Sequence, residues 1–209
     1  MKTPPLALLF AAACALPAFA QEPVALAPTE PVAGLTQVEW SRAWWQWAGA
    51  FDSEQSPVGD RTGALCERKQ SGPVWFLAGT YGTRRTVRTC NVPRDKYIFF
   101  PLINYVVMPG SKESTCASVA GQAASMTDNA FALLLDIDGA RIPIHVGNRQ
   151  ATACFDMGAR TDTRTRVFPS AANGYYVMLR PLSPGKHVIN FGGALPGMLQ
   201  AVTYTLEVE

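Results

Sequence analysis

From residue 73 to the end, short apolar segments alternate with turns rich in proline and glycine, and this pattern restricts the possible folds more than any other feature. Runs of about four to eight residues rich in β-branched and aromatic side chains, bounded by turn residues, are typical of strands. Such runs occupy residues 73–78, 85–90, 96–100, 103–108, 131–137, 141–146, 174–180, 186–191 and 201–208, with weaker candidates at 151–157 and 164–168. The pattern predicts a mainly β protein, an antiparallel β-sandwich of the immunoglobulin-like or jelly-roll kind.

Two local signals strengthen this prediction. In residues 201–208, apolar side chains such as Val202 alternate with polar ones such as Thr203, as expected for a strand with one buried face. Asp138 and Gly139 predict a tight hairpin turn because glycine tolerates the positive φ that such a turn requires.

The last 35 residues or so resemble the closing strands of immunoglobulin-like and related β-sandwich modules. The similarity rests on a strand at 174–180, the turn Leu182-Ser-Pro-Gly185 and the strand start Gly185-Lys-His187. The resemblance implies a sandwich fold and carries no catalytic residue with it.

An aromatic helix is predicted ahead of the strands. Thr36 and Glu39 have the spacing of a capping box, which marks a helix start. Four aromatic residues then recur at helical spacing and should pack on a sheet: Trp40, Trp44, Trp47 and Phe51. Trp45 lies off this stripe and is a candidate ligand-binding residue, a platform for a sugar ring. Residues 114–129, rich in Ala, Ser and Gln, fit a second short helix or a long loop.

The N-terminus has the form of a signal peptide. A basic start is followed by an apolar run over residues 6–16 and by Ala18-Phe19-Ala20, a small-x-small cleavage site. The run is too short to span a bilayer as a helix. We expect residues 1–20 to be removed, proline-rich residues 21–34 to form an extended lead-in, and residues 35–209 to form a single disulfide-stapled β-sandwich domain.

Export would place the protein in the periplasm or outside the cell, where disulfides form. Four cysteines follow the leader: Cys66, Cys90, Cys116 and Cys154. Four cysteines allow three connectivities. We expect cysteines that are consecutive along the chain to pair, Cys66 with Cys90 and Cys116 with Cys154, because each bridge then closes one local loop.

Charge and motif spacing exclude several classes of function. A formal net charge of +2 provides no polybasic surface for nucleic acid. After residue 20, no apolar run approaches the roughly 20 residues of a transmembrane helix. The sequence contains no metal-ligand spacing, no phosphate or dinucleotide loop and no Gly-x-Ser-x-Gly motif, so we expect no metal and no cofactor.

Polar clusters supply weak candidates for a site. Arg84 and Arg88 would share a face of an extended segment, and guanidinium pairs suit carboxylate, sulfate or phosphate. Asp60 belongs to an acidic cluster that could serve glycoside hydrolysis or hold calcium through several oxygens. Tyr81 and His145 could transfer a proton in a polysaccharide lyase. Each also has a plain structural interpretation, as a solvated surface residue or a hydrogen-bonded core residue.

The leading interpretation is an exported, envelope-associated or secreted recognition module that binds a glycan or another envelope component. The first alternative is a carbohydrate-active enzyme, a polysaccharide lyase or hydrolase acting on an acidic glycan. In that case Arg84 and Arg88 would hold the sugar and Tyr81 or His145 would transfer the proton. The second alternative is a periplasmic inhibitor or immunity-type protein with a protein partner.

Overall fold

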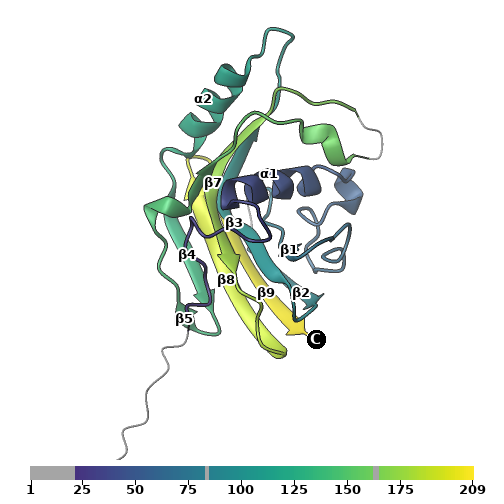
Figure 1. Cartoon of the computed structure of the whole chain (residues 1–209), viewed down its shortest axis with the longest axis vertical. Helices are drawn as coiled ribbons and strands as arrows, with labels where there is room; N and C mark the ends of the chain where they lie inside the picture. The colour runs from purple at the N-terminus through teal and green to yellow at the C-terminus, as the bar shows by residue number, and fades with distance from the viewer. Residues whose placement is uncertain (1–21, 83–84, 162–164) are drawn as a thin grey trace, which may run out of the picture.

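The strands of the protein form two sheets in a computed structural model that describes residues 22–82, 85–161 and 165–209 (Figure 1). The strands are β1 (Val74–Phe76), β2 (Thr86–Val92), β3 (Tyr97–Val107), β4 (Phe131–Ile137), β5 (Ala140–Arg141), β6 (Arg149–Ala151), β7 (Ala171–Leu179), β8 (Gly185–Leu195) and β9 (Met198–Val208). The helices are α1 (Gln37–Ala48) and α2 (Cys116–Thr127), with short 3₁₀ helices at Ser53–Gln55, Val146–Asn148 and Met157–Arg160. This architecture confirms the predicted mainly β sandwich. The predicted signal peptide and Arg84 lie outside the described residues.

Strand pairing in both sheets is antiparallel except at one edge of each. The first sheet has the order β1-β3-β7-β6 and the second the order β2-β9-β8-β4-β5. The edge strand β1 runs parallel to β3, and the edge strand β2 runs parallel to β9. Parallel neighbours need a long crossover connection, and here β2 lies between β1 and β3 in the chain but belongs to the other sheet. Local alternation in the sequence does not reveal these parallel edges.

The main hydrophobic core lies between the two sheets. In β9, Val202, Tyr204, Leu206 and Val208 are buried while the residues between them are half-buried, as the alternation predicted. They face inward side chains of the first sheet, including Phe100 of β3 and Val177 of β7. Phe100 also contacts Phe191 of β8, with ring centroids 4.5 Å apart. Alternation at period two thus gives each strand one face for this core.

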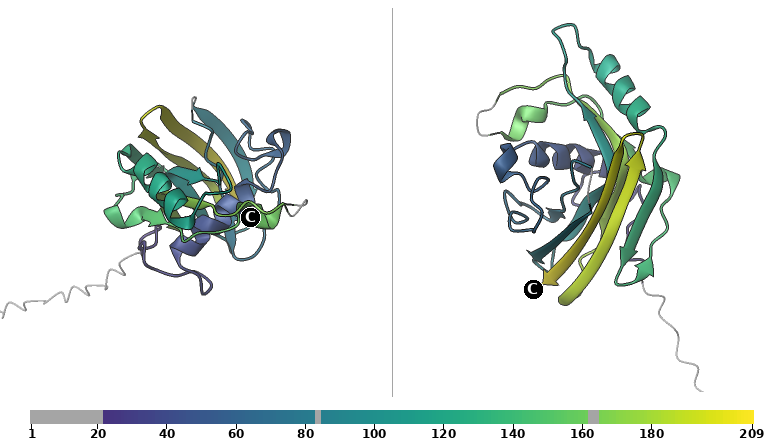
Figure 2. Two further views of the ribbon diagram at one scale, coloured as in Figure 1. Left: turned by 90° about the horizontal axis from the view of Figure 1, so that it is seen from above. Right: turned by 180° about the vertical axis from the view of Figure 1, so that it is seen from behind.

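Helix α1 covers the outer face of the first sheet (Figures 1 and 2). Both halves of the predicted capping box form between Thr36 and Glu39. Three tryptophans of the stripe, Trp40, Trp44 and Trp47, are buried against outward side chains of the sheet such as Phe76, Phe99 and Tyr176. Phe51 lies beyond the helix end and contacts Trp47 edge-on. The helix therefore adds a third layer to the sandwich.

Some element boundaries differ from the expected ones. The segments 96–100 and 103–108 form one strand, β3, whose register shifts between Pro101 and Ile103. Proline cannot donate to the ladder, and the irregularity accommodates it without ending the strand. Residues 114–129 contain α2 rather than a loop. The strand expected at 141–146 is reduced to the end of β5, and residues 165–168 form no strand.

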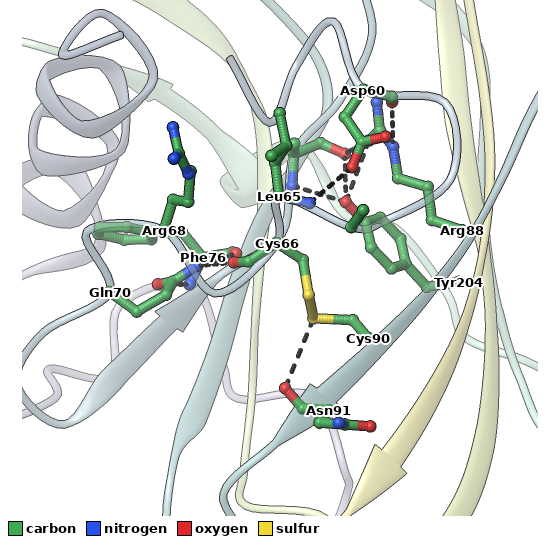
Figure 3. Close-up of a disulfide and its surroundings, with 12 residues drawn as sticks. Asp60, Leu65, Cys66, Arg68, Gln70, Phe76, Arg88, Cys90, Asn91 and Tyr204 are labelled. Atoms are coloured by element: carbon green, nitrogen blue, oxygen red, sulfur yellow. Dashed lines mark hydrogen bonds between the residues drawn. A yellow bond between two sulfur atoms is a disulfide. The ribbon is translucent and has the colours of Figure 1, made fainter. Parts of the chain in front are cut away.

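Two disulfides link loops and helices to the sandwich. Cys66 pairs with Cys90 and Cys116 with Cys154, at Cα–Cα distances of 6.0 and 5.5 Å, which are the pairs that the chain-neighbour argument predicts. The first joins the loop before β1 to strand β2 (Figure 3). The second joins the start of α2 to the segment after β6. Both fit a protein that folds outside the reducing cytoplasm.

None of the helices formed by residues 22–82, 85–161 and 165–209 is long and apolar enough to cross a membrane.

Candidate functional site

A cleft lies between α1 and the end of the first sheet, and we call it the aromatic cleft. Its volume of about 370 Å³ falls within the usual range of small-molecule sites, about 300 to 1,000 Å³. The lining residues are Trp44, Trp45, Ala48, Gly49, Val58, Thr80, Tyr81, Asn104, Tyr105, Val106, Met108, Met157 and Met198. Trp45 and Tyr81, two candidates from the sequence, therefore line one cavity although 36 positions separate them in the chain.

Trp45 occupies the α1 wall of the cleft. Its ring is half-buried and packs edge-on against Trp44, with centroids 5.0 Å apart. Its indole Nε1 donates to the hydroxyl of Tyr176 at 2.8 Å. Since one ring edge is held by this bond, the indole has a defined orientation in the cleft. An aromatic ring fixed in this way can present apolar surface to a ligand at low entropic cost.

Asn104 of β3 is the most buried polar side chain of the lining. It is 4% exposed, and its amide Nδ2 donates to the Tyr176 hydroxyl at 3.2 Å. Its partner in the register is Gly174, where a Cβ would lie 2.5 Å from the Asn104 Cα. The second polar atom of the amide, Oδ1, has no protein partner among the described residues, but it is not one of the fully buried unpaired atoms, so solvent in the cleft can reach it. The cleft thus contains a buried amide with hydrogen-bonding capacity left over.

The hydroxyl of Tyr176 links Trp45 to Asn104. Burial raises its pKa, although the hydrogen bonds from Asn104 and Trp45 act in the opposite direction. The phenol therefore stays protonated at any physiological pH and serves as a neutral junction. Its ring stacks on Phe99 at 5.5 Å, which fixes it in the layer beneath α1.

Tyr81 forms the opposite wall on a loop between β1 and β2. It is 69% exposed, and its hydroxyl lies 3.3 Å from the Ser56 hydroxyl. The adjacent Thr80 amide donates to Oε1 of buried Gln200, whose Nε2 donates to the carbonyls of Pro101 and Leu102. The loop is thereby attached to the irregular part of β3, while the Tyr81 ring itself remains open to solvent.

Arg88 lies in the interior and is not on an exposed strand face as the sequence suggested. It is 1% exposed because β2 alternates strictly and places Arg88 on the same face as Cys90 and Val92. Its guanidinium donates to the backbone carbonyls of Val58, Asp60, Ala78 and Gly79 and to the hydroxyl of Tyr204, at 2.7 to 3.0 Å. Figure 3 shows Arg88 between Asp60 and Tyr204. These contacts leave it unavailable to a ligand. Arg88 instead joins the two loops that carry Val58 and Tyr81.

The Asp60 carboxylate organises its own loop. It accepts hydrogen bonds from the backbone and hydroxyl of Thr62 and from the backbone of Leu65, at 2.8 to 2.9 Å (Figure 3). Burial alone would raise the pKa of Asp60, but these hydrogen bonds and the nearby Arg88 hold it below the usual value. Asp60 lines a neighbouring depression of about 320 Å³ that shares Val58, Thr80 and Tyr81 with the aromatic cleft. As an anion with its oxygens occupied, it is poorly suited to act as a general acid.

His145 lies away from these residues, in a separate cavity between the lead-in and residues 142–145. The structure therefore groups Trp45 and Tyr81 in the cleft, places Asp60 beside it and Arg88 beneath it, and separates His145 from all four. Arg84 is outside the described residues. A further cavity of about 460 Å³ near Phe51, Arg68 and Lys69 contains none of the predicted site residues.

Asp138, His187 and Ser183 form another polar cluster, where the turn between β4 and β5 meets the start of β8 and the connection before it. His187 Nδ1 lies 2.7 Å from the Asp138 carboxylate, and Nε2 lies 2.9 Å from the Ser183 carbonyl and 3.3 Å from its hydroxyl. A catalytic triad needs a free lone pair on Nε2. Here the carbonyl requires Nε2 to carry a hydrogen, and the carboxylate favours one on Nδ1. The cluster is therefore a clamp that favours the imidazolium form of His187, and it offers no free Nε2 lone pair for a general base.

Sequence reasoning missed Asn104 and the three methionines of the cleft, whereas Tyr176 could be named only as one of several strand tyrosines and histidines. Asn104 had one signal, since it is a polar residue inside an otherwise apolar run. The methionines come from three distant segments and share no pattern. Among the described residues, no group of three or more His, Cys, Asp and Glu side chains could hold a metal ion.

Comparisons with protein-family models, with curated protein sequences and with solved structures found no match to this chain.

Proposed function

We propose that the protein is an exported recognition module, periplasmic or secreted, that binds a glycan or another envelope component in the aromatic cleft. One observation carries the proposal: Trp45 and Tyr81 line the same cavity as the buried Asn104 amide, which has an unpaired polar atom. Apolar cavities with a few convergent polar groups are the usual form of small-molecule sites. The two disulfides and the predicted leader support the location.

The surroundings of the other candidate residues favour binding over catalysis. A glycoside hydrolase needs two carboxyl groups beside the substrate, and a lyase needs a positive group against the uronate. None of the described lining residues of the cleft is charged. Asp60 and Arg88 are both engaged by the protein itself. The enzyme alternative therefore has less support than the binding module.

A protein partner is supported by the rim of the cleft. Tyr81 is 69% exposed and Met108 is 51% exposed. Large apolar side chains exposed together mark many protein interaction sites. An inhibitor or immunity-type protein would use this rim, and a stoichiometric protein would then copurify with the mature chain.

A thermal-shift screen tests the leading proposal. Neutral, uronate and sulfated oligosaccharides and peptidoglycan fragments form the panel. A ligand at about 100 times its dissociation constant stabilises the native state by about 2.7 kcal/mol. We expect at least one class to raise Tm, and we expect the Tyr81→Ala variant to lose most of that shift relative to its own ligand-free Tm.

The matched control is Phe131→Ala on β4, which removes a similarly exposed aromatic ring that does not line the cleft. It should keep the full ligand-induced shift. A shift that survives in Tyr81→Ala would place the ligand elsewhere and contradict the proposal.

A further inference from the structure

The cleft is apolar and uncharged. Four aromatic residues and three methionines line it, and the remaining side chains are small or aliphatic apart from Thr80 and Asn104. Methionine side chains are flexible and polarisable, so they adapt to ligands of variable shape. Met108 directly follows β3, Met157 begins the 3₁₀ helix at Met157–Arg160, and Met198 begins β9. Such a lining favours aliphatic surface over a polar ring.

A charged group would be poorly accommodated here. A carboxylate or sulfate inside the cleft would lose its hydration without gaining a cation, because no described lining residue carries a positive charge. A sugar ring carries several hydroxyl groups, each of which needs a partner when buried. The lining offers mainly Asn104, Thr80 and the tyrosine hydroxyls. Both arguments point away from acidic glycans and extended glycans.

The Asn104 amide specifies one polar group on the ligand. One of its polar atoms is bonded to Tyr176 and the other has no partner among the described residues. A ligand that excludes water from this atom without replacing its hydrogen bond would leave a buried amide group unpaired, at a cost of about 1–3 kcal/mol. A hydroxyl can either donate or accept, so it can satisfy the amide whichever of its two polar atoms is presented.

We propose that the aromatic cleft binds a neutral amphiphile whose hydroxyl group pairs with Asn104 and whose aliphatic chain lies against Met108, Met157 and Met198. This inference rests on the proposed function, and it selects an apolar envelope component over a glycan. The volume is adequate: a dry apolar cavity of about 150 Å³ holds benzene, and the cleft has about 370 Å³. The rim at Tyr81 and Met108 is open enough for a longer chain to leave the cleft.

Three hexyl probes test this inference on the mature protein. Hexan-1-ol carries the hydroxyl, 1-chlorohexane has the same chain without it, and hexanoate replaces it with a negative charge. Binding is followed by tryptophan fluorescence, since Trp44 and Trp45 line the cleft. We expect hexan-1-ol to bind about tenfold more tightly than 1-chlorohexane, the effect of one hydrogen bond, and hexanoate to bind more weakly still.

Two variants locate the site. Asn104→Leu should abolish the preference for hexan-1-ol over 1-chlorohexane, whereas Ala48→Phe should fill the cleft and weaken all three probes. Met126→Ala on α2, which is exposed outside the cleft, is the control and should leave binding unchanged. If Asn104→Leu fails to fold, the wild-type comparison of alcohol with chloride still tests the hydroxyl, and Ala48→Phe still tests the location.

The outcomes separate the two proposals. Equal binding of hexan-1-ol and hexanoate would contradict the proposal that the cleft binds a neutral amphiphile. Probe binding that Ala48→Phe leaves intact would contradict it as well. If the hexyl probes fail while an oligosaccharide of the screen binds in a Tyr81-dependent way, the amphiphile is excluded and the recognition module stands. If nothing binds in the cleft, both proposals are wrong.

Discussion

Arg88 is a buried cation that the fold uses as a structural group. Its acceptors are four backbone carbonyls and the Tyr204 hydroxyl. The guanidinium of arginine is planar and supplies five donors, so a single side chain can satisfy carbonyls of several loops at once. Without it, the buried Val58 carbonyl would lose its donor, and the Ala78 carbonyl would keep only the longer bond from the Tyr204 hydroxyl at 3.4 Å. The residue therefore positions the Tyr81 wall of the cleft without touching a ligand.

We expect Arg88→Met to lower the free energy of unfolding by about 3–5 kcal/mol, because it leaves several buried carbonyls unpaired. Urea unfolding followed by tryptophan fluorescence measures this loss. Arg85→Met, which removes an exposed arginine just before the same strand, should change the free energy by less than about 0.5 kcal/mol. Similar values for the two variants would show that Arg88 is not a structural group.

The residues of the cleft differ in how far the sequence predicts them. Trp45 can be selected because it departs from the helical stripe, and Tyr81 because it precedes an arginine cluster. Asn104 acquires its role only through Tyr176, which lies 72 positions later in the chain. Arg88 was misassigned because a charged residue in a strand is usually solvated, and only tertiary contacts reveal the carbonyls that keep it inside.

The helices and turns that are specified by neighbouring residues could be predicted from the local sequence. Helix α1 begins after Thr36 because its capping box satisfies free backbone donors, and its tryptophan stripe packs on the sheet. The turn at Asp138 and Gly139 has φ values of 52° and 83°, as a tight hairpin requires. By contrast, β3 continues past Pro101 because β7 pairs with it on both sides of the irregularity. Pairing of this kind is not visible in one segment.

The clamp between the β4–β5 turn and the start of β8 predicts a pH dependence of stability. Burial lowers the pKa of His187, but hydrogen bonds with Asp138 and Ser183 raise it overall above the usual value of 6.5. Burial raises the pKa of Asp138, but hydrogen bonds from His187 and Val188 lower it overall below 3.8. The His187 contribution is therefore complete below its unfolded pKa and is lost as pH rises through the folded value. The Asp138 contribution is lost as pH falls below about 3.8.

We expect the contribution of this pair to be lost as pH rises above the usual histidine pKa of 6.5 and through the raised value of His187. The loss should be no more than about 1 kcal/mol because the pair is partly solvated. In His187→Gln this pH-dependent loss should be smaller. Denaturant unfolding at several pH values gives the slope. An identical slope in both proteins would mean that the imidazolium contributes nothing to stability.

At the scale of the whole molecule, two disulfides link parts that the sheets alone would leave loosely attached. Their sequence separations are 24 and 38 residues. Loop-closure entropy predicts about 3–4 kcal/mol for each, slightly more for the longer loop. Burial predicts the opposite order of stabilisation, because Cys66 and Cys90 are buried whereas Cys116 is exposed. Comparing the stability lost when each bridge is removed therefore separates the contribution of loop closure from that of burial.

We expect the double variant Cys66→Ala/Cys90→Ala to lose more stability than Cys116→Ala/Cys154→Ala, because it also removes packing in the main core. It should also weaken ligand binding, since this bridge holds the loop that follows Val58 and Asp60. Thermal unfolding and probe titration measure both effects. The reverse order of stability would show that loop length, not burial, sets the contribution of each bridge.

The sequence by itself determined the features that depend on neighbouring residues: the strand-rich composition, the capped aromatic helix, the hairpin turn and the four cysteines after residue 20 that are suited to bridges. The tertiary structure decided the sheet order, the parallel edges, the burial of Arg88 and the meeting of Trp45, Tyr81 and Asn104. The physical reason is the distance along the chain over which each interaction acts. Propensity, capping and alternation act over a few positions, whereas a cleft forms where segments distant in the chain are packed together to bury apolar surface.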